Sequence, residues 1–152
     1  MLNDALRRLE QLAPCLRVQL AQLQTARLDA YGARSEHETA ARTVADTERR
    51  LKGHFASFNS RVGSAQVLSA QEVQCWRAAL ATAIRDVDVA VRLANDASEE
   101  LERKRQALSV AEARVRLLES ALQTAQRRAA RGREALAFAA AEHLRRPREL
   151  QP

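Results

Sequence analysis

The sequence has few of the residues from which most globular cores and sheets are built. Its 152 residues include one Trp, one Tyr and three Phe, with four Gly and three Pro. So few aromatics make a large globular core difficult to assemble, and so few Gly and Pro leave little material for the turns of a β architecture. The composition favours long helices that bury only a seam, and we expect one such domain over residues 1–152.

The sequence also lacks long apolar runs. The longest uncharged stretch, 62–71, is too short to cross a bilayer. Charged residues such as Asp4, Arg7 and Glu10 interrupt the N-terminal segment, so we do not expect it to act as a signal peptide. The only cysteines are Cys15 and Cys75. A reducing cytoplasm is the simplest location for such a chain.

No catalytic or cofactor-binding motif is recognisable in the sequence. It has no phosphate-binding glycine loop, no nucleophile elbow, and no His or Cys pairs at metal-ligand spacing. The three histidines, His37, His54 and His143, are remote from one another in sequence. We therefore expect no enzyme activity, no cofactor, no metal and no small-molecule substrate.

What the sequence does have is an apolar residue at every seventh position, in two long columns. Such a strict heptad predicts helices that wind around each other as a left-handed coiled coil. Because one short break separates the columns, we expect an all-α fold, a long antiparallel two-helix coiled-coil hairpin. The first column is Leu2, Leu9, Leu16, Leu23, Ala30, His37, Val44, Leu51 and Phe58, and the second is Val73, Leu80, Val87, Ala94, Leu101, Leu108, Val115, Leu122, Ala129 and Leu136.

Local signals set the expected boundaries. Helix one should cover about 3–58 with a kink near Pro14, which lacks a backbone N–H. A turn should follow at about 59–69. Ser69 and Glu72 form a capping-box pattern that predicts the start of helix two, at about 70–145. Residues 146–152, which contain Pro147, should form a tail.

The two columns suggest a register for the hairpin. Pairing Phe58 with Val73 brings Leu2 opposite Ala129, so that the columns end together. The weak stretch around Ala30 and His37 buries little area and should be the least stable part of helix one. The first column of helix one is here called the large column. A second column in helix two, here called the small column, consists mainly of small residues, which predicts a narrow gap between the helices. The small column is Trp76, Ala83, Ala90, Ala97, Lys104, Ala111, Leu118, Ala125, Gly132 and Ala139.

The charge is basic, with 25 Lys and Arg against 19 Asp and Glu, and the only lysines are Lys52 and Lys104. One interpretation of this positive charge is that the protein binds nucleic acid or a membrane. The other, which we favour, is that a high-GC genome encodes arginine often.

Arginines gather where the two termini should meet. Glutamates interrupt this cluster and aromatics are scarce in it, so an acidic protein partner fits it better than nucleic acid, and a merely solvated surface remains the alternative. Its candidate contact residues are Arg7, Arg8, Arg127, Arg128, Arg131 and Arg133.

Aromatic residues gather at the other end of the expected hairpin, beside the turn. They are Phe55, Phe58 and Trp76. We favour a structural interpretation, in which Trp76 closes the hairpin against Phe55 or Phe58. The functional alternative is an exposed aromatic patch that docks a partner.

These features together resemble a known family. They are the two-helix coil, the Asn59-Ser60 and Gly63 turn, an aromatic early in helix two, and the segments 80–84, 101–108 and 117–119. The family is that of the central-stalk proteins of type III secretion ATPases, which includes the flagellar FliJ and injectisome YscO proteins and their Hrp-system counterparts. The resemblance covers nearly the whole chain.

The resemblance implies a non-enzymatic coupling component of a bacterial secretion system. The end bearing the termini would insert into a hexameric secretion ATPase through the six arginines named above. The patch of Phe55, Phe58 and Trp76 would face the export-gate membrane protein, and secretion chaperones are further implied partners. Such a protein would lie in the cytoplasm, peripheral to the inner-membrane secretion apparatus. The alternatives are a coiled-coil scaffold, a secretion chaperone or, with less support, a basic nucleic-acid-binding coil.

Overall fold

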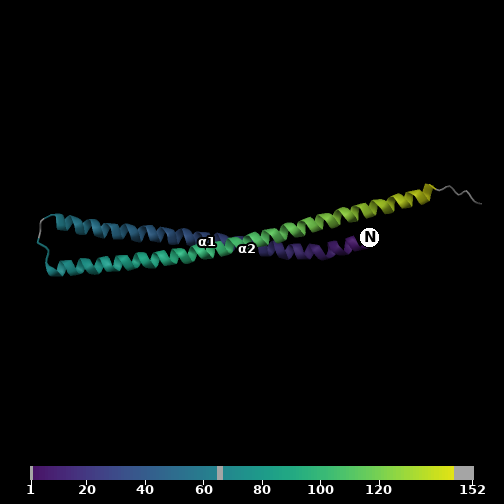
Figure 1. Cartoon of the computed structure of the whole chain (residues 1–152). Coiled ribbons are helices and arrows are strands. Elements are labelled where there is room, and N and C mark those ends of the chain that lie inside the picture. Colours follow the sequence, from purple (N-terminus) through teal and green to yellow (C-terminus); the bar gives the residue numbers. More distant parts are fainter. Residues whose placement is uncertain (1, 65–66, 146–152) are drawn as a thin grey trace, which may run out of the picture. The chain divides into compact units, whose positions relative to one another are not determined.

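In the computed structural model, which describes residues 2–64 and 67–145, the chain folds into a two-helix hairpin. Helix α1 runs over Leu2–Gly63 and helix α2 over Ala70–Arg145, and the described residues include no strand. The expected all-α coiled-coil hairpin is confirmed (Figure 1). The expected tail at 146–152 lies outside the described residues.

Helix α1 is longer than its sequence signals suggested. It continues through residues 59–63, which we had assigned to the turn, and ends at Gly63. Pro14 lies inside α1 without breaking it. The side chain of Pro14 is exposed, so its missing N–H weakens the helix on the solvent side, where water can satisfy the carbonyl left without a partner.

The start of α2 is a capping box, as the sequence predicted. The Glu72 backbone N–H donates to the Ser69 hydroxyl at 3.2 Å, and the Ser69 backbone N–H donates to the Glu72 carboxylate at 2.8 Å. The first main-chain bond of the helix runs from the Val73 N–H to the Ser69 carbonyl at 3.1 Å. These bonds satisfy amides that a helix N-terminus otherwise leaves unpaired, and so they fix where α2 begins.

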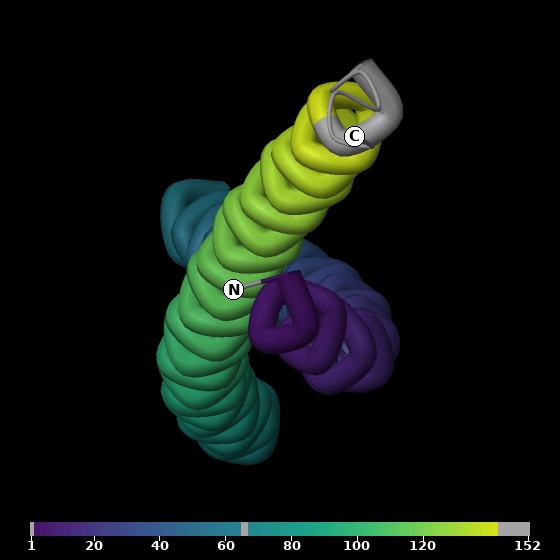
Figure 2. The backbone as a smooth tube through the Cα atoms, turned by 90° about the vertical axis from the view of Figure 1, so that its right-hand side faces the viewer, coloured from purple at the N-terminus to yellow at the C-terminus, as the bar shows by residue number. Residues whose placement is uncertain are grey.

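The chain divides into two compact units. One, here called the terminal unit, combines residues 1–26 with 107–152, and the other, the turn unit, comprises residues 27–106. In each unit a segment of α1 packs against a segment of α2 (Figures 1 and 2). In Figure 2 the purple start of α1 lies beside the green part of α2 in the terminal unit.

The buried positions follow the heptad in both helices. Residues shielded from solvent recur at alternate spacings of three and four, which is the seam of a coiled coil. In α1 the most buried side chains are Ala5, Leu23, Ala33 and Thr47, and in α2 they are Ala83, Ala90, Leu101, Val115, Ala125 and Ala129.

The register differs from the expected one by three residues. Phe58 contacts Trp76 rather than Val73, and Leu2 lies against Gly132 rather than Ala129. The same offset places Leu51 opposite Ala83 and Leu9 opposite Ala125. The large column of α1 therefore meets the small column of α2, so that most layers of these two columns combine a large residue with a small one.

Candidate protein-interaction surfaces

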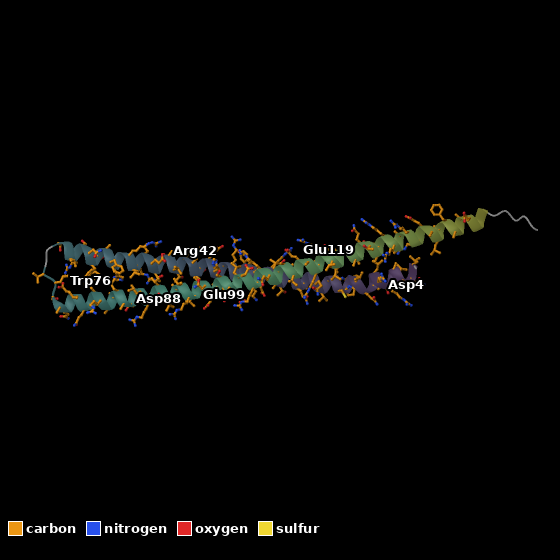
Figure 3. The ribbon with its side chains drawn as sticks, in the orientation of Figure 1. Asp4, Arg42, Trp76, Asp88, Glu99 and Glu119 are labelled. Atoms are coloured by element: carbon orange, nitrogen blue, oxygen red, sulfur yellow. The ribbon has the colours of Figure 1, made fainter. Side chains whose placement is uncertain are left out.

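The aromatic cluster of the turn unit is mainly a packing feature. The rings of Phe58 and Trp76 lie edge to face with centroids 6.0 Å apart, and both side chains are half-buried. Figure 3 shows Trp76 near the start of α2. Phe55 lies on the flank of α1 and remains 45% exposed. Of the three aromatics proposed to face an export gate, Phe55 alone is exposed, and slightly more than half of its surface is still covered.

A charged network closes the turn unit beside these rings. The Arg61 guanidinium donates to the Glu72 carboxylate at 2.8 Å, which joins the last turn of α1 to the first turn of α2. The backbone N–H of Ser69, its hydroxyl and Arg61 hold the pKa of the Glu72 carboxyl below its usual value. The sequence identified Ser69 and Glu72 as a cap, but it gave no signal for Arg61, because that contact depends on the length of the turn.

A second polar contact crosses the seam farther along the turn unit. Lys104 occupies the small column of α2 and its ammonium donates to the Asp29 carboxylate at 3.1 Å. The pKa of Lys104 is raised above its usual value, mainly because of this hydrogen bond to Asp29. A lysine at a seam position lowers the stability of a coiled coil but favours one register over others. Here the favoured register is the one in which Lys104 forms its ion pair with Asp29.

A shallow hollow of about 390 Å³ lies nearer the turn. His54, Arg50 and Asp86 are among its lining residues. These side chains are brought together from α1 and α2, a grouping that the sequence did not indicate because it depends on the register.

The arginines of the terminal unit are exposed but do not form one patch. Arg8, Arg128 and Arg131 line a groove between α1 and α2. Arg7, Arg127 and Arg133 are also exposed, but they lie outside that lining. The six residues proposed to contact an ATPase therefore divide into two sets of three, which the heptad places at different angles around the helices.

This groove, here called the terminal groove, has a volume of about 1280 Å³. Small and aliphatic side chains form its floor. Among the described residues of its lining, the one acidic member is Asp4, labelled at the start of α1 in Figure 3. Its apolar members are Leu2, Ala5, Leu12, Cys15, Ala121, Ala125, Gly132, Ala135 and Leu136. An apolar floor edged by cations is suited to binding another protein segment.

A smaller groove of about 600 Å³ adjoins the terminal groove. Pro14, Val18 and Leu117 line it, and Cys15 belongs to the linings of both grooves. Val18 is 55% exposed and Leu117 is 71% exposed. Both cysteines of the chain are free and exposed. The sequence reasoning missed these grooves, because they exist only once the register has set which side chains flank the seam.

Among residues 2–64 and 67–145, no group of three or more His, Cys, Asp or Glu side chains is placed to hold a metal ion. No helix in the same ranges is both long and apolar enough to cross a membrane.

The fold defines a class, that of all-α coiled-coil hairpins. Comparison of the chain with known protein families, with characterised proteins and with solved structures finds no match.

Proposed function

We propose that the chain is a non-enzymatic stalk of a bacterial type III secretion system. In this proposal the terminal unit inserts into the hexameric export ATPase, and the turn unit contacts the export-gate membrane protein. The protein then works in the cytoplasm, peripheral to the inner-membrane apparatus, and requires no cofactor. The observation that carries the proposal is the separation of surfaces: exposed arginines on the terminal unit, and Phe55 beside an aromatic closure on the turn unit.

The physical basis of the proposal is electrostatic. A ring that presents acidic side chains toward its centre would attract the arginines of the terminal unit, and the attraction would speed association at low salt. The resemblance of the sequence to the central-stalk family supports the same assignment. Secretion chaperones are further proposed partners.

The test is the effect of the chain on the secretion ATPase of its own organism. The purified chain should increase ATP turnover and the fraction of ATPase found as hexamer. A variant with Arg127, Arg128 and Arg131 changed to Glu should lose both effects, while retaining the helical content of the wild type. If the wild type has no effect on turnover or assembly, the stalk proposal is wrong.

A coiled-coil scaffold or chaperone is the second candidate, and the terminal groove favours it, because an open apolar surface suits binding of another chain. Co-purification with a secreted protein, without any effect on the ATPase, would support this candidate. Tight binding to duplex DNA that falls steeply with salt would instead indicate a nucleic-acid-binding coil.

A further inference from the structure

We propose that the terminal groove binds a third helix, an amphipathic helix of a partner protein whose apolar stripe is bordered by carboxylates. The bound helix would complete a three-helix bundle in the terminal unit. This inference goes beyond the stalk assignment, because it concerns one flank of the seam and holds whichever protein supplies the helix.

The floor of the groove is suited to a helix. Ala5, Ala121, Ala125 and Ala135 present only methyl groups there. Small residues let a third backbone approach closely and accept large side chains from the incoming helix, as in the interfaces of helical bundles. Leu2 and Leu12 add apolar area along α1.

The two grooves have the length of a helix rather than of a small ligand. Their α2 lining runs from Arg114 to Leu136, which at 1.5 Å per residue spans about 33 Å. A partner helix of roughly 22 residues would cover that distance. Leu117 and Val18, which are largely exposed, would then be covered at one end of the site.

The opposite end of the site contains an exposed leucine at a seam position. Leu136 continues the heptad column of α2 beyond Ala129 and is 60% exposed. Because Leu136 also lines the terminal groove, a helix lying in the groove would bury it. The third helix would thus restore burial to a residue that already has seam periodicity.

Charge determines which helix fits. Arg8, Arg128 and Arg131 line the groove against the single carboxylate of Asp4. A helix bearing glutamates beside its apolar stripe would meet these guanidinium groups, which bind carboxylates with well-defined geometry. A second copy of this chain would instead bring its own arginines against them at distances shorter than the Debye length, so like charges oppose a homodimer on this face.

The experiment uses the full chain and a synthetic peptide probe of about 20 residues, with Leu at helical heptad positions and Glu beside them. Fluorescence anisotropy should show binding with one peptide per chain. The same peptide with Lys in place of Glu should bind at least about tenfold more weakly, because it places like charges against the rim.

Matched charge reversals test the location. The double variant Arg8→Glu/Arg128→Glu changes two lining residues and should weaken binding of the Glu peptide about tenfold or more. The control Arg7→Glu/Arg127→Glu changes the net charge equally at neighbouring exposed positions outside the lining, and should retain most of the affinity. Circular dichroism establishes that both variants remain helical. Equal weakening in the two variants would show only general attraction to a basic chain, and would overturn the proposal.

The two cysteines provide a footprint without further mutation. Cys15 lies in the lining of both grooves, whereas Cys75 lies in the turn unit, and both are exposed. Bound peptide should slow alkylation of Cys15 by a neutral iodoacetamide several-fold and leave Cys75 unchanged. Unchanged reactivity of Cys15 would overturn the proposal. It would also be overturned by sedimentation of the chain alone as a dimer with protected Cys15, or by vesicles of anionic lipid protecting Cys15 where the peptide does not.

Discussion

Trp76 and Phe58 pack edge to face across the hairpin, with ring centroids 6.0 Å apart and an interplanar angle of 61°. This contact fixes the register, because Trp76 belongs to the small column of α2 and Phe58 to the large column of α1. It also favours a structural role for Trp76, since a ring engaged with Phe58 offers less surface to a partner.

The structural role of this pair predicts a measurable coupling. Trp76→Ala should lower the free energy of unfolding by about 2 kcal/mol, less than for a fully buried aromatic because Trp76 is half-buried. In a double-mutant cycle with Phe58→Ala, the interaction should amount to about 0.5–1.5 kcal/mol. Urea unfolding followed by circular dichroism measures both quantities.

Phe55 provides the control for the pair. It is 45% exposed, so Phe55→Ala should change the free energy of unfolding by less than about 0.5 kcal/mol. If all three alanine variants unfold like the wild type, the aromatic cluster does not hold the hairpin together and its role must be sought in binding.

The glycines of the helices should respond differently to alanine. Gly32 and Gly53 lie inside α1 with nothing within 4 Å of an added Cβ, so Gly32→Ala and Gly53→Ala should each stabilise the chain by about 1 kcal/mol through helix propensity. At Gly132 the added Cβ would lie 3.1 Å from Leu2 Cδ1 and 3.3 Å from Leu2 Cβ. Since Leu2 must then shift, Gly132→Ala should stabilise less, or destabilise.

Thermal unfolding of the three variants checks this order. Combining Gly132→Ala with Leu2→Ala removes the close contact and should recover most of the propensity gain. An equal rise for all three single variants would mean that Leu2 does not pack closely on Gly132, and the three-residue shift of register would lose one of its two supports.

Much of the fold was readable from the sequence because it depends on local patterns. The heptad columns predicted both helices and their seam, and the Ser69–Glu72 spacing predicted the start of α2. The residues after Phe58 misled the prediction of where helix one ends, since their turn-like character does not stop the helix before Gly63. Helix α1 continues through Pro14, as expected from the seam, which stays in phase on both sides of that residue.

The register was not readable because both columns of α2 have the same period. A heptad alone accepts Phe58 opposite Val73 or opposite Trp76, and only the fit of large against small side chains separates the two. A separate error concerns the surfaces: the sequence grouped Arg7 with Arg8 and Arg127 with Arg128, although successive residues lie about 100° apart around a helix and only Arg8 and Arg128 line the terminal groove.

The cap of α2 should make stability depend on pH in the acid range. The pKa of Glu72 is lower in the folded chain, so the carboxylate stabilises the fold above its unfolded pKa, near 4.3 for an ordinary glutamate. That contribution is lost as the pH falls through the lower, folded pKa. Glu72→Gln should therefore reduce the melting temperature at neutral pH, and the difference from the wild type should vanish in acid.

Ser69→Ala tests the other half of the cap. Loss of its hydroxyl leaves the Glu72 N–H without that acceptor and should cost about 1 kcal/mol. This cost should persist at acid pH, where the effect of Glu72→Gln disappears. Melting curves for both variants between neutral and acid pH separate the hydroxyl from the carboxylate.

The seam around His37 should be the first internal part of the hairpin to open. In the observed register His37 lies opposite Ala97 and Ala40 opposite Ala94, so these layers bury little apolar area compared with those around Leu23. Amide hydrogen exchange should consequently be faster at 36–41 than at 19–24. His37→Leu, which places an aliphatic side chain against Ala97, should slow exchange at 36–41 and raise the free energy of unfolding by about 1 kcal/mol.

The matched control is Glu36→Leu, on the exposed flank beside His37. It should neither slow exchange at 36–41 nor raise the free energy of unfolding, since the added side chain has no opposing helix to pack against. Equal exchange in the two segments of the wild type would contradict the inference that apolar burial in the seam sets the local stability of these helices.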